Sequence, residues 1–341
     1  GGTTFRFLLT YLCTLQTPHI LTGSEAFCKR PVHTLVEALR TLGADIQYID
    51  LPDRPPLRIS PSNMHGGELM IDASLSSQFI SALMLIAPTL KGGLKIHLTT
   101  PSVSMPYLNM TAQLMRTFGI NVELTEKYIV IQEGAYQSKD FWVEPDWSAA
   151  GFWFAWIACA QPGASLFLKN LRLSGLQGDE QAIRFFLLLG VQAEVKEDGM
   201  LITKTIIPVS SYLEVDFLSC PDLAQPFIAA LCCLKIKAHC TGLQTLIHKE
   251  TNRLLALQSE LSKTGAMIEI TNSTLQIKDY TNPLDSLVFD TYHDHRMAMC
   301  MALFVQRFEH IVISQPDVVK KSYPSFWYQL SKFVEMQRFS D

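Results

Sequence analysis

Two patterns of hydrophobic and polar positions recur along this chain of 341 residues. In the first pattern, an amphipathic stretch ends at a glycine, and polar and apolar residues then alternate. This order predicts a helix that ends at a left-handed glycine and is followed by a half-buried strand. The glycines are 71 to 76 residues apart, which indicates a repeat. The four copies are residues 39–48, 115–124, 186–195 and 261–270, with Gly43, Gly119, Gly190 and Gly265 at the helix ends.

The second pattern has nearly the same spacing. A short polar cluster precedes a helix that is apolar almost all round, and a β-rich segment follows. A helix of that kind is buried on every side. Marker residues of five such clusters, which lie 72 to 74 residues apart, are Thr3, Ser76, Ser148, Asp222 and Asp294. We predict an α/β fold in two domains, built from repeats of an apolar helix, a strand, an amphipathic helix and two strands.

Composition agrees with buried helices. Charged residues make up 18% of the chain, against roughly 25% in an ordinary soluble domain. The net charge is −4 and no block of like charge is present, which excludes the basic surface of a general nucleic-acid binder and a polybasic membrane patch. The longest apolar run, residues 149–160, is shorter than the roughly 18 residues of a membrane span.

The eight cysteines form no C-x-x-C pair, and several lie within apolar runs. A zinc site or a disulfide framework needs a more regular spacing. We therefore expect reduced, mostly buried thiols in a cytoplasmic protein, since no signal peptide is visible.

The predicted helix starts are candidate anion sites, because the first backbone N–H groups of a helix bind anions. At any single start the alternative is that Ser, Thr and Asp are simple N-caps. Two starts carry more than a cap needs: Gln78 follows two serines, and His295 and Arg296 follow Asp294. Further basic residues stand near the predicted turns between elements, namely Arg30, Lys249, Arg253, Lys320 and Lys321. Together they favour a site for small phosphorylated or carboxylated molecules.

Sequence motifs for other chemistries are lacking. The sequence has no P-loop, dinucleotide fingerprint or H-E-x-x-H, so it does not favour a nucleotide or metal site.

Several motifs occur in a fixed order through essentially the whole chain. The most specific are T-Y-H-D-H-R-M-A-M at 291–299, Ser76-Ser77-Gln78 within 72–79, and Lys249-Glu250-Thr251 with Arg253. Weaker ones are Thr22-Gly23 with Arg30-Pro31, Ser104 with Pro106-Tyr107, Gln177-Gly178-Asp179, Pro221-Asp222 and Lys321-Ser322-Tyr323-Pro324. In residues and in order, these motifs resemble those of the EPSP synthase (3-phosphoshikimate 1-carboxyvinyltransferase) family.

The resemblance implies an inside-out α/β fold of two domains, here residues 1–143 and 144–341. Each domain of the family has three βαβαββ units around buried helices, and the site lies between the domains. The implied reaction transfers the enolpyruvyl group of phosphoenolpyruvate to the 5-hydroxyl of shikimate 3-phosphate and releases phosphate. The resemblance implies no metal or organic cofactor, and small-molecule substrates as the only partners. We expect a monomer.

The resemblance also assigns roles to residues. Asp222 would accept the proton of the attacking hydroxyl, while Glu250, His295 and Lys321 complete the catalytic set. Shikimate 3-phosphate would be bound by Ser76, Ser77, Gln78, Ser104, Tyr107, Asp222, Thr245 and Lys249. Phosphoenolpyruvate would be bound by Gly2, Arg30, Gln78, Arg253, Arg296 and Lys321. We expect Arg6, nearby, to be structural, and Cys28 to be incidental.

The sequence departs from the family at several positions. Met105 replaces a basic residue, Thr245 replaces Asn and Asn252 replaces Asp. The family has a first repeat, with a Lys-Ser pair, before the position of Gly2. We therefore expect a shortened chain with little turnover unless that repeat is supplied.

Two other functions stay open at this point. One is a transferase that acts on UDP-N-acetylglucosamine, which Ser76-Ser77-Gln78 and Tyr107 disfavour. The other is a binding relative without catalytic activity. Asp222, Glu250, Arg253, His295, Arg296 and Lys321 argue against it, because a relative without catalysis has no need of all six.

Overall fold

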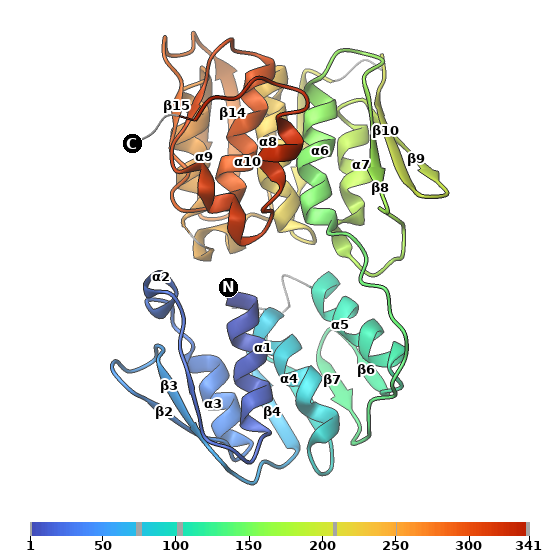
Figure 1. The fold of residues 1–341 in the computed structure, drawn as a ribbon, viewed down its shortest axis with the longest axis vertical. Helices are drawn as coiled ribbons and strands as arrows, with labels where there is room; N and C mark the ends of the chain where they lie inside the picture. Colours follow the sequence, from blue (N-terminus) through green and yellow to red (C-terminus); the bar gives the residue numbers. More distant parts are fainter. Residues whose placement is uncertain (1, 73–76, 101–104, 207–209, 250, 339–341) are drawn as a thin grey trace. The chain divides into compact units, whose positions relative to one another are not determined.

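The computed structural model describes residues 2–72, 77–100, 105–206, 210–249 and 251–338. The chain divides into two compact units, Gly1–Trp142 and Val143–Asp341, which Figure 1 shows in blue to teal and in green to red. We refer to them as unit 1 and unit 2. Ser76, Ser104 and Glu250, three of the predicted site residues, lie outside the described residues.

Unit 1 contains a three-stranded antiparallel sheet of order β1-β3-β2 and a four-stranded mixed sheet of order β4-β5-β7-β6. Its elements in chain order are α1 (Gly2–Cys13), β1 (His19–Leu21), α2 (Glu25–Cys28), α3 (His33–Thr41), β2 (Asp45–Tyr48), β3 (Leu57–Ser60), β4 (Gly67–Ile71), α4 (Ser77–Ile86), η1 (Ala87–Thr89), β5 (Leu94–Leu98), α5 (Met105–Thr117), β6 (Val122–Leu124) and β7 (Tyr128–Ile131).

Unit 2 contains sheets of order β8-β10-β9, β11-β12-β14-β13 and β15-β16. Its first half comprises α6 (Trp147–Cys159), β8 (Ser165–Lys169), η2 (Gly178–Gln181), α7 (Ala182–Leu187), β9 (Val191–Lys196), β10 (Gly199–Lys204), β11 (Tyr212–Asp216), α8 (Pro221–Leu234) and β12 (Lys237–Thr241). Its second half comprises η3 (Gln244–His248), α9 (Arg253–Ser262), β13 (Ala266–Ile270), β14 (Leu275–Tyr280), β15 (Val288–Phe289), α10 (His295–Ala302), η4 (Leu303–Gln306), β16 (Val312–Ile313), η5 (Pro316–Lys321) and α11 (Phe326–Leu330).

The predicted repeat is confirmed. The order β4-α4-β5-α5-β6-β7 in unit 1 recurs as β11-α8-β12-α9-β13-β14 in unit 2. In both copies the first two strands pair in parallel and the others pair antiparallel, which gives the same sheet order. The unit predicted from the sequence began with the apolar helix and did not include the strand that precedes it, β4 or β11. In the last copy that strand, β15, has two residues, which is too few to show an alternation.

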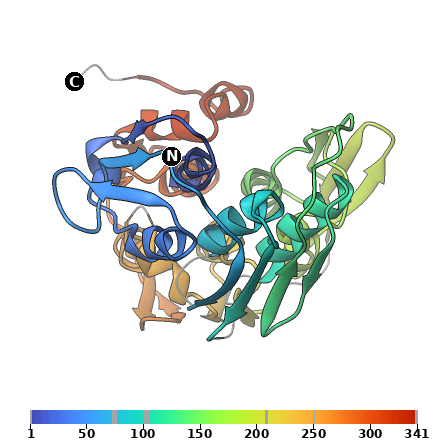
Figure 2. The same ribbon diagram turned by 90° about the horizontal axis from the view of Figure 1, so that it is seen from below.

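The predicted inside-out arrangement of helices and sheets is also confirmed. Within unit 2, α6, α8 and α10 lie side by side (Figure 1), and α8 and α10 are buried along nearly their whole lengths. Figure 2 views α1 of unit 1 nearly end-on, with the strands of that unit toward the outside. Buried helices therefore take the place that the sheet occupies in an ordinary α/β domain, which explains the low proportion of charge.

Both kinds of predicted boundary are found. Gly43, Gly119, Gly190 and Gly265 all have positive φ, between 78° and 94°, after a helix. The central helices begin at Gly2, Ser77, Trp147, Pro221 and His295, next to the predicted markers. These features are local, because a left-handed glycine and a polar cap stop and start a helix from within a few residues.

Aromatic packing stabilises the interior of unit 2. Phe154, Phe185, Phe186, Phe217 and Phe227 form a continuous set with ring centroids 5.1–6.0 Å apart. Burying one such side chain contributes about 1.5–3 kcal/mol, whereas an exposed ion pair contributes about 0–1 kcal/mol. Packing of the central helices, rather than surface charge, is the main stabilising term.

Two further expectations concern the cysteines and membrane segments. Five of the eight thiols are buried, Cys28, Cys159 and Cys233 are half-buried, and none is in a disulfide in the part of the chain that the structure describes. No helix among the described residues is long and apolar enough to cross a bilayer.

We predict that Gly265→Ala destabilises the protein more than Gly163→Ala. Both glycines have φ near +90°, so each substitution costs about 1 kcal/mol through the backbone. At Gly265 the added Cβ would also lie 2.4 Å from the carbonyl oxygen of Thr281, whereas at Gly163 it meets nothing within 4 Å. Urea unfolding measures the difference. Equal losses of unfolding free energy in the two variants would contradict the role given to the close approach of Thr281.

Candidate functional site

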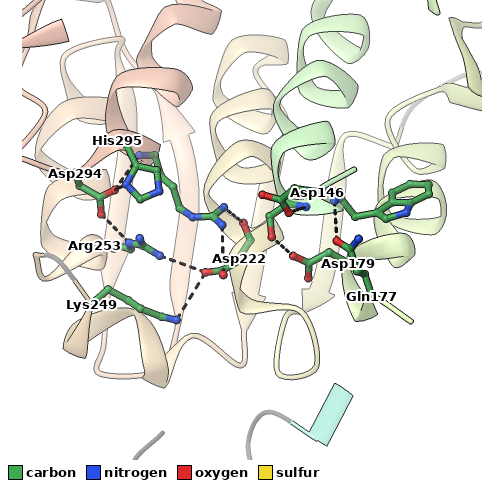
Figure 3. A network of polar contacts seen from close by, with 11 residues as sticks. Asp146, Gln177, Asp179, Asp222, Lys249, Arg253, Asp294 and His295 are labelled. Atoms are coloured by element: carbon green, nitrogen blue, oxygen red, sulfur yellow. Dashed lines mark hydrogen bonds and ion pairs between the residues drawn. The ribbon is translucent and has the colours of Figure 1, made fainter. Parts of the chain in front are cut away.

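A network of ionic contacts lies at one end of unit 2, where α6, α8 and α10 begin (Figure 3). Asp222, in the first turn of α8, is at its centre. Its Oδ1 is 3.3 Å from Arg253 Nη1 and 3.7 Å from Lys249 Nζ. Its Oδ2 is 3.3 Å from Arg296 Nη2, and its backbone carbonyl accepts a hydrogen bond from Arg296 Nη1 at 3.0 Å. One carboxylate therefore faces three cations.

The charges around Asp222 control its protonation. Burial by itself would raise the pKa of this carboxyl. Arg296, Lys249, Arg253 and His295 outweigh that effect and hold the pKa far below its usual range. The side chain is 20% exposed, so an ionised carboxylate is presented to a ligand.

Arg253 is enclosed at the start of α9. Its side chain is 2% exposed, and its Nε donates to Asp294 Oδ2 at 2.7 Å. Asn252, the residue before it, caps α9 by accepting a hydrogen bond from Leu255 N at 3.2 Å. The departure from Asp at position 252 thus keeps the capping function, since Asn and Asp cap equally well.

Asp294 joins two parts of the network. Its Oδ1 caps α10 by accepting from Arg296 N at 2.8 Å, while its Oδ2 binds Arg253. The Nδ1 atom of His295 lies 3.7 Å from the same carboxylate. Arg296 packs over Phe152 of α6, with its guanidinium carbon 5.8 Å from the ring centroid. Arg296 is therefore held by the capping residue of its own helix, α10, and by Phe152 of α6.

Tyr292 and His293, which precede Asp294, both have left-handed backbone conformations, with φ of 51° and 55°. Such a conformation costs a non-glycine residue of order 1–3 kcal/mol. Contacts elsewhere must hold this segment in place.

Another buried carboxylate, Asp179, lies close to Asp222. Its Oδ2 accepts a hydrogen bond from the hydroxyl of Ser148 at the start of α6. Burial and the charge of Asp222 raise the pKa of Asp179 to about 6. The two carboxyls thus differ: Asp222 stays ionised, while Asp179 takes up a proton in weakly acidic solution.

The start of α6 is fixed by a separate set of hydrogen bonds. Asp146 caps the helix through Ser148 N at 2.9 Å, and Gln177 Oε1 accepts from Trp147 N at 2.9 Å. Gln177 Nε2 donates to Glu144 Oε1 at 2.7 Å and to the carbonyl of Pro145 at 2.8 Å. Gln177 therefore positions α6 rather than the ionic network.

A smaller polar cluster lies in unit 1, where α1 and α4 begin. Arg6 donates to Gln78 Oε1 and packs over Phe79, 5.1 Å from the ring centroid. A Cβ built on Gly2 would lie 3.4 Å from Arg6 Nη1 and 3.6 Å from Arg30 Nη1. Four residues, Gly2, Arg6, Arg30 and Gln78, thus come together from segments far apart in the sequence.

The other predicted residues are placed as follows. Ser77 is the first residue of α4, and Tyr107 is half-buried in the first turn of α5. Lys321 is exposed at the end of η5, which packs against α10. Thr245 lies in η3, and its buried hydroxyl has no hydrogen-bond partner among the described residues. Met105 begins α5 and packs on the core of unit 1.

The sequence analysis assigns no site role to three residues of this region: Asp179, Asp294 and Ser148. Ser148 and Asp294 mark helix starts, and Asp179 belongs to a weaker motif. The equivalent positions of Ser148 and Asp294 in their repeats are the available signal, because the starts of the central helices meet at one end of unit 2.

The arrangement is suited to binding anions beside an ionised base. Three cations and the positive ends of three helices surround one partly exposed carboxylate. In the described part of the chain, no group of three His, Cys, Asp or Glu residues is placed to hold a metal ion.

We predict that Asp179→Asn stabilises the protein at pH 7 by roughly 1–3 kcal/mol and much less at pH 4. The native pKa of Asp179 lies above its ordinary value, so the native state binds this proton more tightly than the unfolded chain. The stability from that proton is present at pH 4 and is lost as the pH rises through 6. Asn can still accept from Ser148.

Urea unfolding at pH 4, 5.5 and 7 tests this. Asp285→Asn, at an exposed carboxylate, is the control and leaves the pH profile unchanged. A stabilisation by Asp179→Asn that is equal at all three pH values would contradict the assignment.

Comparison with known proteins identifies the family. The family model for EPSP synthase (3-phosphoshikimate 1-carboxyvinyltransferase) matches residues 1–330. The 3-phosphoshikimate 1-carboxyvinyltransferase of Bacteroides fragilis is 40% identical over 339 residues, which cover 97% of this chain and 81% of that protein. The protein of the same name from Photobacterium profundum is 32% identical over 338 residues, which cover 98% of this chain and 78% of that protein.

The fold agrees with this match. The solved structure of EPSP synthase from Acinetobacter baumannii matches with a TM-score of 0.75 and 20% sequence identity. The match covers 97% of this chain and 77% of the chain in that structure. The chain therefore belongs to the EPSP synthase family, whose members are 3-phosphoshikimate 1-carboxyvinyltransferases.

Proposed function

We propose that the protein transfers the enolpyruvyl group of phosphoenolpyruvate to the 5-hydroxyl of shikimate 3-phosphate and releases phosphate. The observation that carries this proposal is the ionised Asp222 carboxylate among Lys249, Arg253 and Arg296. A hydroxyl nucleophile needs a base, and two phosphorylated substrates need cations beside it.

The cations of unit 2 suit the anionic groups of the substrates. Lys249 is 30% exposed and would bind shikimate 3-phosphate together with Thr245. Arg296 and Lys321 would bind phosphoenolpyruvate. Arg253 is enclosed, but its Nη1 lies 3.3 Å from the partly exposed Asp222, so a ligand at Asp222 is near its guanidinium. A planar guanidinium can bind a carboxylate or phosphate through two parallel hydrogen bonds.

Unit 1 supplies the remaining proposed binding residues. Arg30, Gln78 and the backbone of Gly2, which lie together, would bind phosphoenolpyruvate. Gln78 is also proposed to bind shikimate 3-phosphate, together with Ser77 and Tyr107. Ser76 and Ser104, outside the described residues, are proposed for the same ligand.

The proton transfers follow from the reaction. The 5-oxygen of shikimate 3-phosphate forms a bond to C2 of phosphoenolpyruvate, its proton passes to Asp222, and C3 gains a proton. Phosphate then leaves C2, and C3 loses a proton to restore the double bond. We propose Glu250, His295 and Lys321 for the transfers at C3 and at the leaving phosphate.

Asp222 alone is a weak base, because its cations hold the pKa low. Anionic substrates that bind Lys249 and Arg296 would offset that positive charge. The pKa of Asp222 would then rise, so that the carboxylate becomes a stronger base when both substrates are present. This coupling favours proton abstraction in the ternary complex.

We further propose that residues 1–143 and 144–341 are the two enolpyruvyl transferase domains, which the division of the contacts after Trp142 supports. A monomer in the cytoplasm is proposed as well. Membership of the family favours shikimate 3-phosphate over UDP-N-acetylglucosamine as the acceptor.

We predict that phosphate release from phosphoenolpyruvate requires shikimate 3-phosphate. The purified protein is assayed with both substrates, with the colorimetric yield of inorganic phosphate as the measurement. UDP-N-acetylglucosamine in place of shikimate 3-phosphate should give no release. Equal release with either acceptor would refute the proposed substrate, and no release with either acceptor would refute the proposed activity.

We predict that Asp222→Asn lowers kcat by about 10²–10⁴, the usual contribution of a general base. Binding of shikimate 3-phosphate should not weaken, because Lys249 and Arg296 lose a competing anion. Turnover and calorimetric binding are measured together. Asp279→Asn, at an exposed carboxylate 3.1 Å from Lys237, is the matched control and should retain turnover. An active Asp222→Asn variant would remove the base from the mechanism.

A further inference from the structure

A further carboxylate of unit 2, Glu260, is buried. It lies on α9 seven residues after Arg253, so the two charged side chains occupy one face of the helix. Both are enclosed, Arg253 at 2% and Glu260 at 1% exposure. Two buried polar side chains on the inward face of one amphipathic helix need specific partners.

The partners of Glu260 belong mostly to the segment that leads into α10. Oε2 accepts from the backbone N–H of Asp290 at 2.9 Å, and Oε1 accepts from the hydroxyl of Tyr292 at 2.7 Å. Lys263 Nζ lies 2.6 Å from Oε2 and donates to the carbonyl of Val288 at 2.8 Å. Glu260 and Lys263 therefore bind the segment from 288 to 292.

This segment is the one with left-handed Tyr292 and His293. Tyr292 N donates to Asp290 Oδ1 at 2.9 Å, and Asp294 N donates to the carbonyl of Thr291 at 2.8 Å. These hydrogen bonds, together with the backbone of residues 290–294, thus connect Glu260 to the residue that caps α10. Asp294 in turn binds Arg253 and precedes His295 and Arg296.

We propose that Glu260 is a positioning residue of the site, which holds residues 290–294 so that His295 and Arg296 meet Asp222. Helix α9 then binds residues 290–294 at two places. Arg253 binds Asp294 at the C-terminal end of the segment, and Glu260 binds Asp290 and Tyr292 nearer its N-terminal end. The functional part of this inference rests on the proposed function, whereas the contacts do not.

A carboxylate is needed at this place for a geometric reason. Glu260 presents an acceptor oxygen to Tyr292 and another to Asp290 and Lys263. Glutamine of the same shape has one acceptor oxygen and one amide that only donates. Glu260→Gln must therefore lose either the contact with Tyr292 or the contacts with Asp290 and Lys263. Tyr292→Phe removes one hydroxyl and leaves the contacts with Asp290 and Lys263 in place.

The first test measures the segment itself, without substrate. Hydrogen–deuterium exchange should rise in peptides that cover 288–296 in Glu260→Gln and, less strongly, in Tyr292→Phe. Peptides of α6 and β8 should stay unchanged. Glu269→Gln, which removes an exposed partner of Lys278, is the matched control and leaves all peptides unchanged. Unchanged exchange over 288–296 in both variants would overturn the proposal.

The second test measures the site. In Glu260→Gln the KM for phosphoenolpyruvate should rise about three- to tenfold with a smaller change in kcat, and in Tyr292→Phe by less. Tyr292→Phe keeps the proposal testable if Glu260→Gln does not fold. Faster exchange with unchanged KM in both variants would leave Glu260 as a structural residue and overturn the positioning role. An unaltered protein without turnover would refute the proposed function, which the exchange data do not test.

Discussion

Unit 2 depends on the enclosure of Arg253. A charge that leaves water without compensation costs several kcal/mol, and this guanidinium is almost completely buried. Asp294 compensates it at 2.7 Å and Asp222 at 3.3 Å. These contacts join the first turns of α9, α10 and α8. Loss of either carboxylate would leave the buried guanidinium with one partner instead of two. The three helix starts are thus held together by the same interaction that places the base.

The repeat explains why the helix starts meet, and the differences between its copies explain the chemistry. Asp146 and Asp294 use their carboxylates to cap their own helices. Asp222 lies one residue inside α8, where Cys220 is the N-cap residue and makes no side-chain cap. Its carboxylate is therefore available to Lys249, Arg253 and Arg296 instead of the backbone. A carboxylate two residues after the N-cap position, rather than at it, is thus a candidate base instead of a structural cap.

Some features of the fold could be predicted because they depend on neighbours in sequence. The glycines at the ends of four helices determine local backbone conformation, and so do Asp146 and Asp294, which cap α6 and α10. The two-residue strand β15 could not be predicted, since only its pairing with β16 shows it. The distinct protonation of Asp179 also depends on its nearness to Asp222, 43 positions later in the chain.

The sequence by itself determined the repeated α/β unit, the buried character of the central helices and, through its motifs, the family and the residue types of the site. The tertiary structure decided which of these residues are exposed to a ligand and which are enclosed. Arg253 and Arg296 both lie 3.3 Å from Asp222, but the side chain of Arg253 is 2% exposed and also pairs with Asp294, whereas that of Arg296 is 10% exposed and packs over Phe152. Glu260 has no motif that marks it. Its partners lie 30 and 32 residues away, and contacts at such separations exist only once the chain has folded.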